Sequence, residues 1–233
     1  MKRATVASLM AVAVVGAAGQ VQAQVNQSVS FNVGYYALRA EDARPAGDVL
    51  VENLSFLAFD LADINGATAG ADWLVGVGDY VDLGVGIGYY KRTVPSVYLS
   101  FTNADGSEIP QEMKLRVTPL SVTARFMPLG RRAAVVPYVG AGVAAYRWRY
   151  TETGEFVDFT DSTIFRASYV DEGTKTGPVY LGGVVVPIGD VFAIGGEFRY
   201  QKATADLDPA VGFFGDQIDL GGYVSQFTFQ IRF

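Results

Sequence analysis

The chain of 233 residues contains 18 basic and 24 acidic residues and has a formal net charge of −6, which makes it a poor candidate for nucleic-acid binding. It has neither cysteine nor histidine, which excludes a disulfide framework, a thiolate metal site and the commonest general base. Half of its residues are nevertheless hydrophobic, with 15 phenylalanines and 13 tyrosines, and its length fits a single domain.

The N-terminus has the three parts of a secretory signal peptide. Basic residues at positions 2–3 precede an apolar run over 6–18, and residues 21–23 (VQA) resemble a small-x-small cleavage site. The apolar run is too short and wrongly flanked for a membrane anchor. We therefore expect residues 1–23 to be a signal peptide and residues 24–233 to form one exported domain.

The rest of the chain is apolar without containing a long apolar run. Short segments alternate between apolar and polar or glycine residues, as in strands whose successive side chains face opposite sides. The pattern is clearest where Val81, Leu83 and Val85 alternate with Asp82 and glycines. Eight such segments are predicted, at residues 27–38, 67–77, 80–92, 113–126, 136–150, 174–186, 191–202 and 221–233.

Long and short connections alternate between these segments. The long ones cover residues 39–66, 93–112, 151–173 and 203–217. Outer-membrane barrels place their long loops outside the cell and their short turns in the periplasm. Lipid cannot satisfy an open sheet edge, so the sheet must close. The sequence thus predicts an all-β fold, an eight-stranded antiparallel transmembrane β-barrel.

Three local features leave alternatives open. Residues 48–61 alternate loosely and are compatible with a strand as well as with a loop. With a further strand at 156–169, the barrel would have ten strands. The parity of segment 113–126 slips near Pro119, which predicts a β-bulge there.

Charged and amide side chains fall on the face of the strands that we expect to point inward. The interior of an eight-stranded barrel is just wide enough for side chains to fill, and buried charges are costly unless they are paired. We expect an interior network that plugs the lumen, with Glu197 paired to an arginine; a polar lining of a narrow path is the alternative. The predicted members are Asp82, Arg125, Glu197, Arg199 and Arg232.

The predicted loops hold most of the acidic residues, whereas basic residues gather at the outer ends of strands. This basic collar consists of Lys91, Arg92, Lys114, Arg116, Arg147 and Arg149. One interpretation is that these side chains snorkel to the membrane interface beside aromatic residues. The expected interfacial aromatic residues are Tyr89, Tyr90, Tyr146, Trp148, Tyr150 and Tyr200. The other interpretation is that the collar binds lipopolysaccharide phosphates, while the acidic loops help to hold divalent cations.

No catalytic constellation is recognisable. Serines are present, but there is no histidine to activate them. Glu155, Asp158 and Asp161 form an acidic group in a predicted loop, where carboxylates are usually solvated. The closely spaced glycines of residues 75–88 are not followed by a helix, so a nucleotide-binding motif is excluded. We expect no enzymatic activity, cofactor or metal.

Four motifs carry a resemblance to a known family: VTPLSVTARF (117–126), PYVGAGVAAYRW (137–148), GGEFRYQ (195–201) and QFTFQIRF (226–233). On these motifs the chain resembles the small outer-membrane β-barrel domain family that includes outer-membrane protein W, outer-membrane protein A and the opacity-type adhesins. The terminal aromatic signal shared by such barrels implies recognition by the barrel assembly machinery. Its residues here are Phe229, Ile231 and Phe233.

The resemblance implies an outer-membrane location that is reached through the periplasm. The protein-W-like branch is associated with the passage of small hydrophobic molecules and the opacity branch with adhesion. We expect an integral outer-membrane protein with a structural, surface-interacting role, whose partners are membrane lipids, lipopolysaccharide and an extracellular ligand of unknown identity. The alternative is a narrow, porin-like channel for small hydrophobic molecules.

Overall fold

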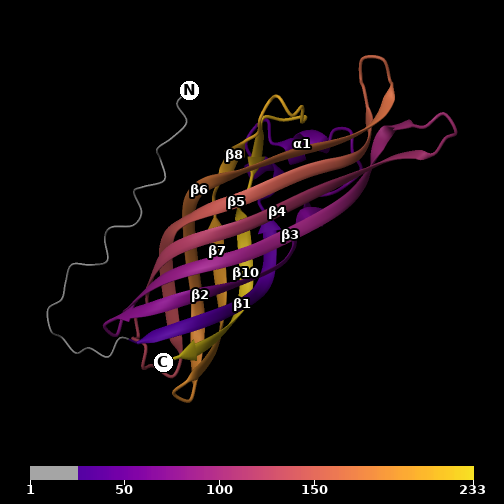
Figure 1. Ribbon diagram of the computed structural model, residues 1–233. Helices are drawn as coiled ribbons and strands as arrows, with labels where there is room; N and C mark the ends of the chain where they lie inside the picture. The colour runs from indigo at the N-terminus through magenta and orange to yellow at the C-terminus, as the bar shows by residue number, and fades with distance from the viewer. Residues whose placement is uncertain (1–25) are drawn as a thin grey trace, which may run out of the picture.

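The computed structural model describes residues 26–233, in which eight antiparallel strands close into a barrel (Figure 1). The strand order is β1-β10-β7-β6-β5-β4-β3-β2, and the ring closes where β1 pairs with β10. The predicted signal peptide lies outside the described residues. Among residues 26–233, no helix is long and apolar enough to cross a membrane.

The barrel strands agree with the eight predicted segments in number and order. They are β1 (Gln27–Leu38), β2 (Gly66–Val77), β3 (Val81–Thr102), β4 (Glu108–Phe126), β5 (Val136–Val157), β6 (Ile164–Ile188), β7 (Phe192–Gln201) and β10 (Gly222–Arg232). A two-stranded sheet of β8 (Thr204–Asp206) and β9 (Gln217–Asp219) lies in the last long connection. The eight-stranded prediction is confirmed, and the ten-stranded alternative is wrong.

Strands β3 to β6 are longer than their sequence patterns indicated. The predicted loop 93–112 is a hairpin of β3 and β4 that turns at residues 103–107, and most of 151–173 belongs to a second hairpin of β5 and β6. Figure 1 shows both hairpins projecting beyond the barrel at one end, while the C-terminus lies at the other end. We refer to the hairpin end as the outer end.

Strand β4 reverses its pattern without changing its register. Near the C-terminal end of the strand, polar residues such as Arg125 point inward, whereas further toward the outer end the inward residues are apolar, as at Leu115. The predicted bulge near Pro119 is wrong, because the pairing of β3 with β4 keeps one register on both sides of it. The apparent slip marks the level at which the interior changes from polar to apolar. The irregularity in this ladder lies instead between Val97 and Thr102.

The first long connection folds over the mouth of the barrel. It contains the 3-10 helices η1 (Glu41–Ala43) and η2 (Leu61–Ile64) and the short helix α1 (Val49–Asn53). The carboxylate of Asp48 caps α1 by accepting from the backbone N–H of Leu50 at 3.1 Å. Residues 48–61, for which a strand or a loop was expected, form a loop that contains α1, and Leu57 makes only an isolated bridge with Tyr98.

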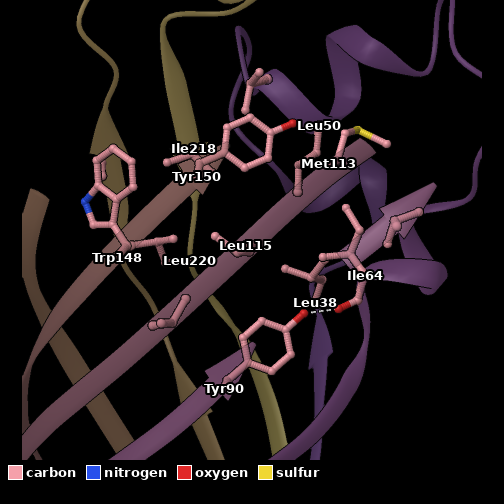
Figure 2. Packing of buried hydrophobic residues seen from close by; sticks show 14 of the residues in the cluster. Leu38, Leu50, Ile64, Tyr90, Met113, Leu115, Trp148, Tyr150, Ile218 and Leu220 are labelled. Atoms are coloured by element: carbon pink, nitrogen blue, oxygen red, sulfur yellow. Dashed lines mark hydrogen bonds between the residues drawn. The ribbon is translucent and has the colours of Figure 1, made fainter. Parts of the chain in front are cut away.

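Helix α1 contributes to an apolar cluster that fills the outer half of the barrel. Figure 2 shows Leu50 beside Met113 and Tyr150, which come from the inward faces of β4 and β5. All three side chains are fully buried. Ile218 and Leu220 from the last connection complete this side of the cluster. The cluster seals the barrel at its outer end.

Candidate functional site

The outer surface of the barrel carries a belt of exposed aromatic and aliphatic side chains. Phe31, Val33 and Tyr35 of β1 are each at least half exposed. Across β7 and β10, the rings of Phe192 and Phe229 stack with centroids 5.7 Å apart. An apolar surface of this extent is stable in contact with lipid rather than with water. We call it the lipid-facing belt.

Immediately beyond this belt, the outward side chains of β3, β4 and β5 are cationic. Lys91 lies directly opposite Arg116, and Arg116 lies directly opposite Arg149. Like charges in directly opposed positions repel one another. Arg149 contacts Glu172 at 3.2 Å, but Lys91 and Arg116 have no ion-pair partner among residues 26–233. This row of three residues therefore presents uncompensated positive charge at the edge of the belt.

The other predicted members of the collar lie nearby, with one exception. Arg147 is exposed one pair of residues closer to the belt, and Lys114 contacts Glu112 at 3.1 Å. Arg92 has the opposite parity and donates from Nε to the carbonyl of Asp63 at 2.7 Å. The outward-facing collar thus comprises Lys91, Lys114, Arg116, Arg147 and Arg149.

Most of the aromatic residues expected at the interface lie inside the barrel. Tyr89 does face outward, and Tyr200 packs with Tyr180 and Tyr223. The expectation is wrong for the others because the interior of the outer half is apolar. The buried residues are Tyr90, Tyr146, Trp148 and Tyr150.

A network of four charges crosses the polar half of the interior. Arg125 contacts Glu197 at 3.1 Å and Asp72 at 3.3 Å. Arg199 also contacts both carboxylates, Asp72 at 2.6 Å and Glu197 in a close ion pair. Each carboxylate therefore faces two guanidinium groups, and the network joins β2, β4 and β7 across the lumen. Such pairing offsets the cost of burying these charges.

Neutral side chains complete the network. Tyr138 donates to Glu197 at 2.7 Å, and Gln226 donates to the same carboxylate at 2.8 Å. Asn32 donates to Asp72 at 2.7 Å. Sequence reasoning missed Asp72, although its alternation with the exposed Trp73 was a usable signal. Glycines opposite the charges leave room for them: a side chain at Gly86 would collide with Asp72.

Two predicted members lie outside this network. Asp82 pairs with Arg131 at 2.9 Å. Arg232 lines a cavity of about 120 Å³ at the end opposite to the hairpins and forms no ion pair with another described residue. Parity alone placed both residues on an inward face, but it did not indicate their depth along the barrel. Depth separates the four-charge network from charges at the rim.

A second polar cluster fixes the first connection to the last one. Arg44 and Asp48 form a fully buried ion pair at 2.9 Å. Asp48 also accepts from the backbone N–H of Asp219 at 2.7 Å, and Arg44 donates to the carbonyl of Asp219 at 3.0 Å. Asp219 in turn pairs with Arg39. The cluster holds α1 and β9 together above the apolar cluster.

The residues of the predicted assembly signal lie along the final strand. Phe229 and Phe233 face outward in an exposed row, with the partly buried Ile231 between them. The backbone of Phe233 exchanges two hydrogen bonds with Gln27, at 2.9 and 3.0 Å. The C-terminal residue therefore ties the start of β1 to the end of β10, at the seam where the barrel closes.

The acidic residues of the second hairpin have local partners. Glu155 pairs with Arg166 at 2.9 Å. Asp158 accepts from the backbone and hydroxyl of Thr160, which holds the pKa of this exposed carboxyl below its ordinary value. Among residues 26–233, no cluster of three or more acidic residues is arranged to hold a metal ion.

No family model and no curated protein matches the sequence. Among solved structures, the chain is similar to the outer membrane protein OprG from Pseudomonas aeruginosa, with 12% identity, a TM-score of 0.51 and coverage of 90% of this chain and 96% of that one. The fold is that of a small outer-membrane β-barrel.

Two further barrels are similar with lower TM-scores. Neisserial surface protein A has 12% identity and a TM-score of 0.46 over 89% of this chain and 97% of its own. Outer membrane protein W from Escherichia coli has 16% identity and a TM-score of 0.40 over 88% and 97%. The predicted resemblance to small outer-membrane barrels is confirmed at the level of the fold by the similarity to OprG.

Proposed function

We propose that this protein is an integral outer-membrane barrel with a structural and surface-interacting role. The observation that carries the proposal is the double closure of the lumen. The four-charge network occupies the polar half of the interior, and the apolar cluster with α1 occupies the outer half. A barrel closed at two levels is suited to anchoring a surface in the membrane rather than to conducting solutes.

The alternative of a narrow channel for small hydrophobic molecules meets two obstacles. A hydrophobic solute in the lumen would have to displace buried ion pairs, and this is costly because each charge would lose its partner. At the level of the lipid-facing belt, the backbone ladders are also continuous around the ring, including the seam between β1 and β10. At this level the described strands therefore offer no gap in their pairing for lateral exit into the membrane.

The collar supports lipopolysaccharide as the lipid partner. Its opposed cations lie at the outer edge of the lipid-facing belt, where the phosphates of an outer leaflet would lie. Arginine forms bidentate contacts with phosphate, and lysine acts as a point charge. An anionic headgroup would relieve the repulsion within the row formed by Lys91, Arg116 and Arg149.

Planar-bilayer conductance and solute uptake into liposomes test the closed-barrel proposal. The folded protein should give no discrete conductance steps and no uptake of small hydrophobic molecules above empty liposomes. A barrel variant that lacks residues 41–64 serves as the comparison, because it removes the outer seal. Steps or uptake with the parent protein would overturn the proposal and favour the channel.

A further inference from the structure

A cavity of about 270 Å³ lies at the outer end of the molecule, between the second hairpin and the last connection. Aromatic rings form most of its wall. Phe56 packs against Tyr98, Phe159 and Phe214, with ring centroids 5.8, 5.6 and 4.9 Å away. Phe159 and Phe214 are about half exposed, so the cavity opens to the outside. These four rings come from the first connection, strand β3, the turn of the second hairpin and the last connection, which only the fold brings together.

A buried carboxylate lines this cavity. Glu152 is 4% exposed and accepts hydrogen bonds from Asn53 at 2.6 Å, Tyr150 at 2.7 Å and Gln111 at 3.3 Å. All three donors are neutral, and no lysine or arginine of residues 26–233 forms an ion pair with Glu152. Burial therefore raises the pKa of Glu152, because desolvation disfavours the charged form.

Glu152 differs in this respect from the other buried carboxylates of the described chain. Asp72 and Glu197 face Arg125 and Arg199, and Asp48 and Asp219 face arginines as well. Glu152 also lies beyond the lipid-facing belt, since its neighbours on the outward face of β5 are threonines at positions 151 and 153. The lipid environment of the belt therefore does not explain why Glu152 lacks a cationic partner.

A second polar group of the cavity lacks a partner. Gln111 is 3% exposed, and its amide nitrogen donates to Glu152, but its carbonyl oxygen Oε1 is buried without a donor. An unsatisfied buried acceptor is costly. The cavity thus combines the buried, uncompensated carboxylate of Glu152, the exposed carboxylate of Asp158, one unused acceptor and a wall of aromatic rings.

We propose that this cavity binds a small organic cation, namely a protonated amine with an apolar body. Its positive charge would compensate Glu152, and an N–H would satisfy Oε1 of Gln111. Aromatic faces attract cations through their quadrupoles, so the rings of Phe56, Phe159 and Phe214 would hold both the charge and the apolar body. An anion would be repelled by Glu152, and a hydrocarbon would leave the charge of Glu152 uncompensated and Oε1 of Gln111 without a donor. The proposal is independent of lipopolysaccharide binding, since the collar lies below the cavity on the outward face.

Isothermal titration of the protein purified from outer membranes in detergent tests the proposal with three probes. The probes are 2-phenylethylammonium, its neutral analogue 2-phenylethanol and the anion 3-phenylpropionate. Only the ammonium should bind with clear preference. Glu152→Gln should weaken this binding roughly 10- to 100-fold, the range expected for the loss of a charge-assisted hydrogen bond. Glutamine should fold in place, because rotation of the Gln111 amide turns its free oxygen toward the new nitrogen.

Two further variants make the result specific. Glu112→Gln removes a neighbouring carboxylate on the outward face and should leave the affinity unchanged. The double variant Phe159→Leu and Phe214→Leu keeps the apolar wall at an exposed mouth but removes two rings, and it should weaken ammonium binding several-fold. Equal binding of the alcohol and the ammonium, an unchanged affinity in Glu152→Gln, or no binding of the ammonium at millimolar concentration would each overturn the proposal.

Discussion

At the scale of single residues, the four-charge network is arranged so that no charge depends on one partner. Glu197 contacts Arg125 and Arg199, and Asp72 contacts the same two arginines. Removal of either carboxylate leaves two buried cations with a single anion. A buried charge that loses its partner costs more than the intact pair contributes, so the network is more sensitive to truncation than to a conservative change.

Glu197→Ala should therefore destabilise the folded barrel by about 3–5 kcal/mol, because it leaves an uncompensated charge in the interior. Unfolding and refolding titrations with urea in detergent measure this free energy. Glu112→Ala is the matched control: its exposed ion pair with Lys114 should contribute less than about 1 kcal/mol. A loss of no more than about 0.5 kcal/mol in Glu197→Ala would mean that the network is solvated.

At the scale of elements, α1 owes its position to polar contacts as much as to packing. A helix of five residues is not stable alone, so its cap and its docking surface must hold it. Asp48 supplies both: it caps the helix, pairs with Arg44 and accepts from the backbone of Asp219. The seal of the barrel is thus a separate unit that can loosen while the strands stay paired.

Asp48→Ala should release this unit without unfolding the barrel. It removes the helix cap and leaves Arg44 buried without its carboxylate. Protease added to intact cells should then cleave within residues 41–65, while the protein keeps the gel mobility of the folded form. Glu52→Ala, an exposed position of the same helix, should stay resistant. Resistance of Asp48→Ala to cleavage would contradict this role of Asp48.

At the end of the final strand, Phe233 contacts the start of β1 at the seam of the barrel. Deletion of Phe233 removes an exposed ring and two backbone hydrogen bonds to Gln27 at the closing seam. The heat-modifiable folded form in outer-membrane fractions should fall sharply, whereas Phe233→Tyr, which keeps the ring and the backbone, should fold normally. A normal folded yield after the deletion would exclude Phe233 from the assembly signal.

The sequence predicted the strands that surround the polar half of the interior better than those that surround the apolar half. The segments at the level of the belt alternate apolar-out and polar-in, and their count and order were predictable from period two alone. Residues 151–157 continue β5 with threonines on the outward face, and residues 93–102 continue β3 with apolar side chains on both faces. Neither segment has the apolar-out, polar-in pattern, so both look like loops in the sequence. The network was partly predictable, since Arg125, Glu197 and Arg199 share an inward parity, but depth along the barrel is a property of the tertiary register. The cavity around Glu152 was not predictable, because its rings come from connections with no common pattern.

At the scale of the whole molecule, the types of residue that face inward and outward change at one level along the barrel. On the membrane side of this level, apolar residues face outward and charges face inward; beyond it, apolar residues face inward and the collar faces outward. The exchange matches a change in solvent from lipid to an aqueous, anionic layer. The opposed cations at this level repel one another in the isolated protein, and under the proposed function an anionic headgroup would relieve this repulsion.

Arg116→Gln combined with Arg149→Gln should reduce the lipopolysaccharide that copurifies with the folded barrel. The substitution keeps length and polarity but removes charge from the row that also contains Lys91, and phosphate contacts depend on that charge. The matched control is Arg132→Gln with Arg166→Gln, which removes the same charge from two exposed positions outside the collar. Phosphate analysis of the purified proteins should show a loss in the first variant alone.

The stability of the collar variant in lipopolysaccharide-free detergent should be unchanged or slightly raised, because repulsion within the row is relieved. If the collar variant retains as much bound lipid as the parent, the basic side chains only snorkel to the interface, and the partner is not recognised through its phosphates.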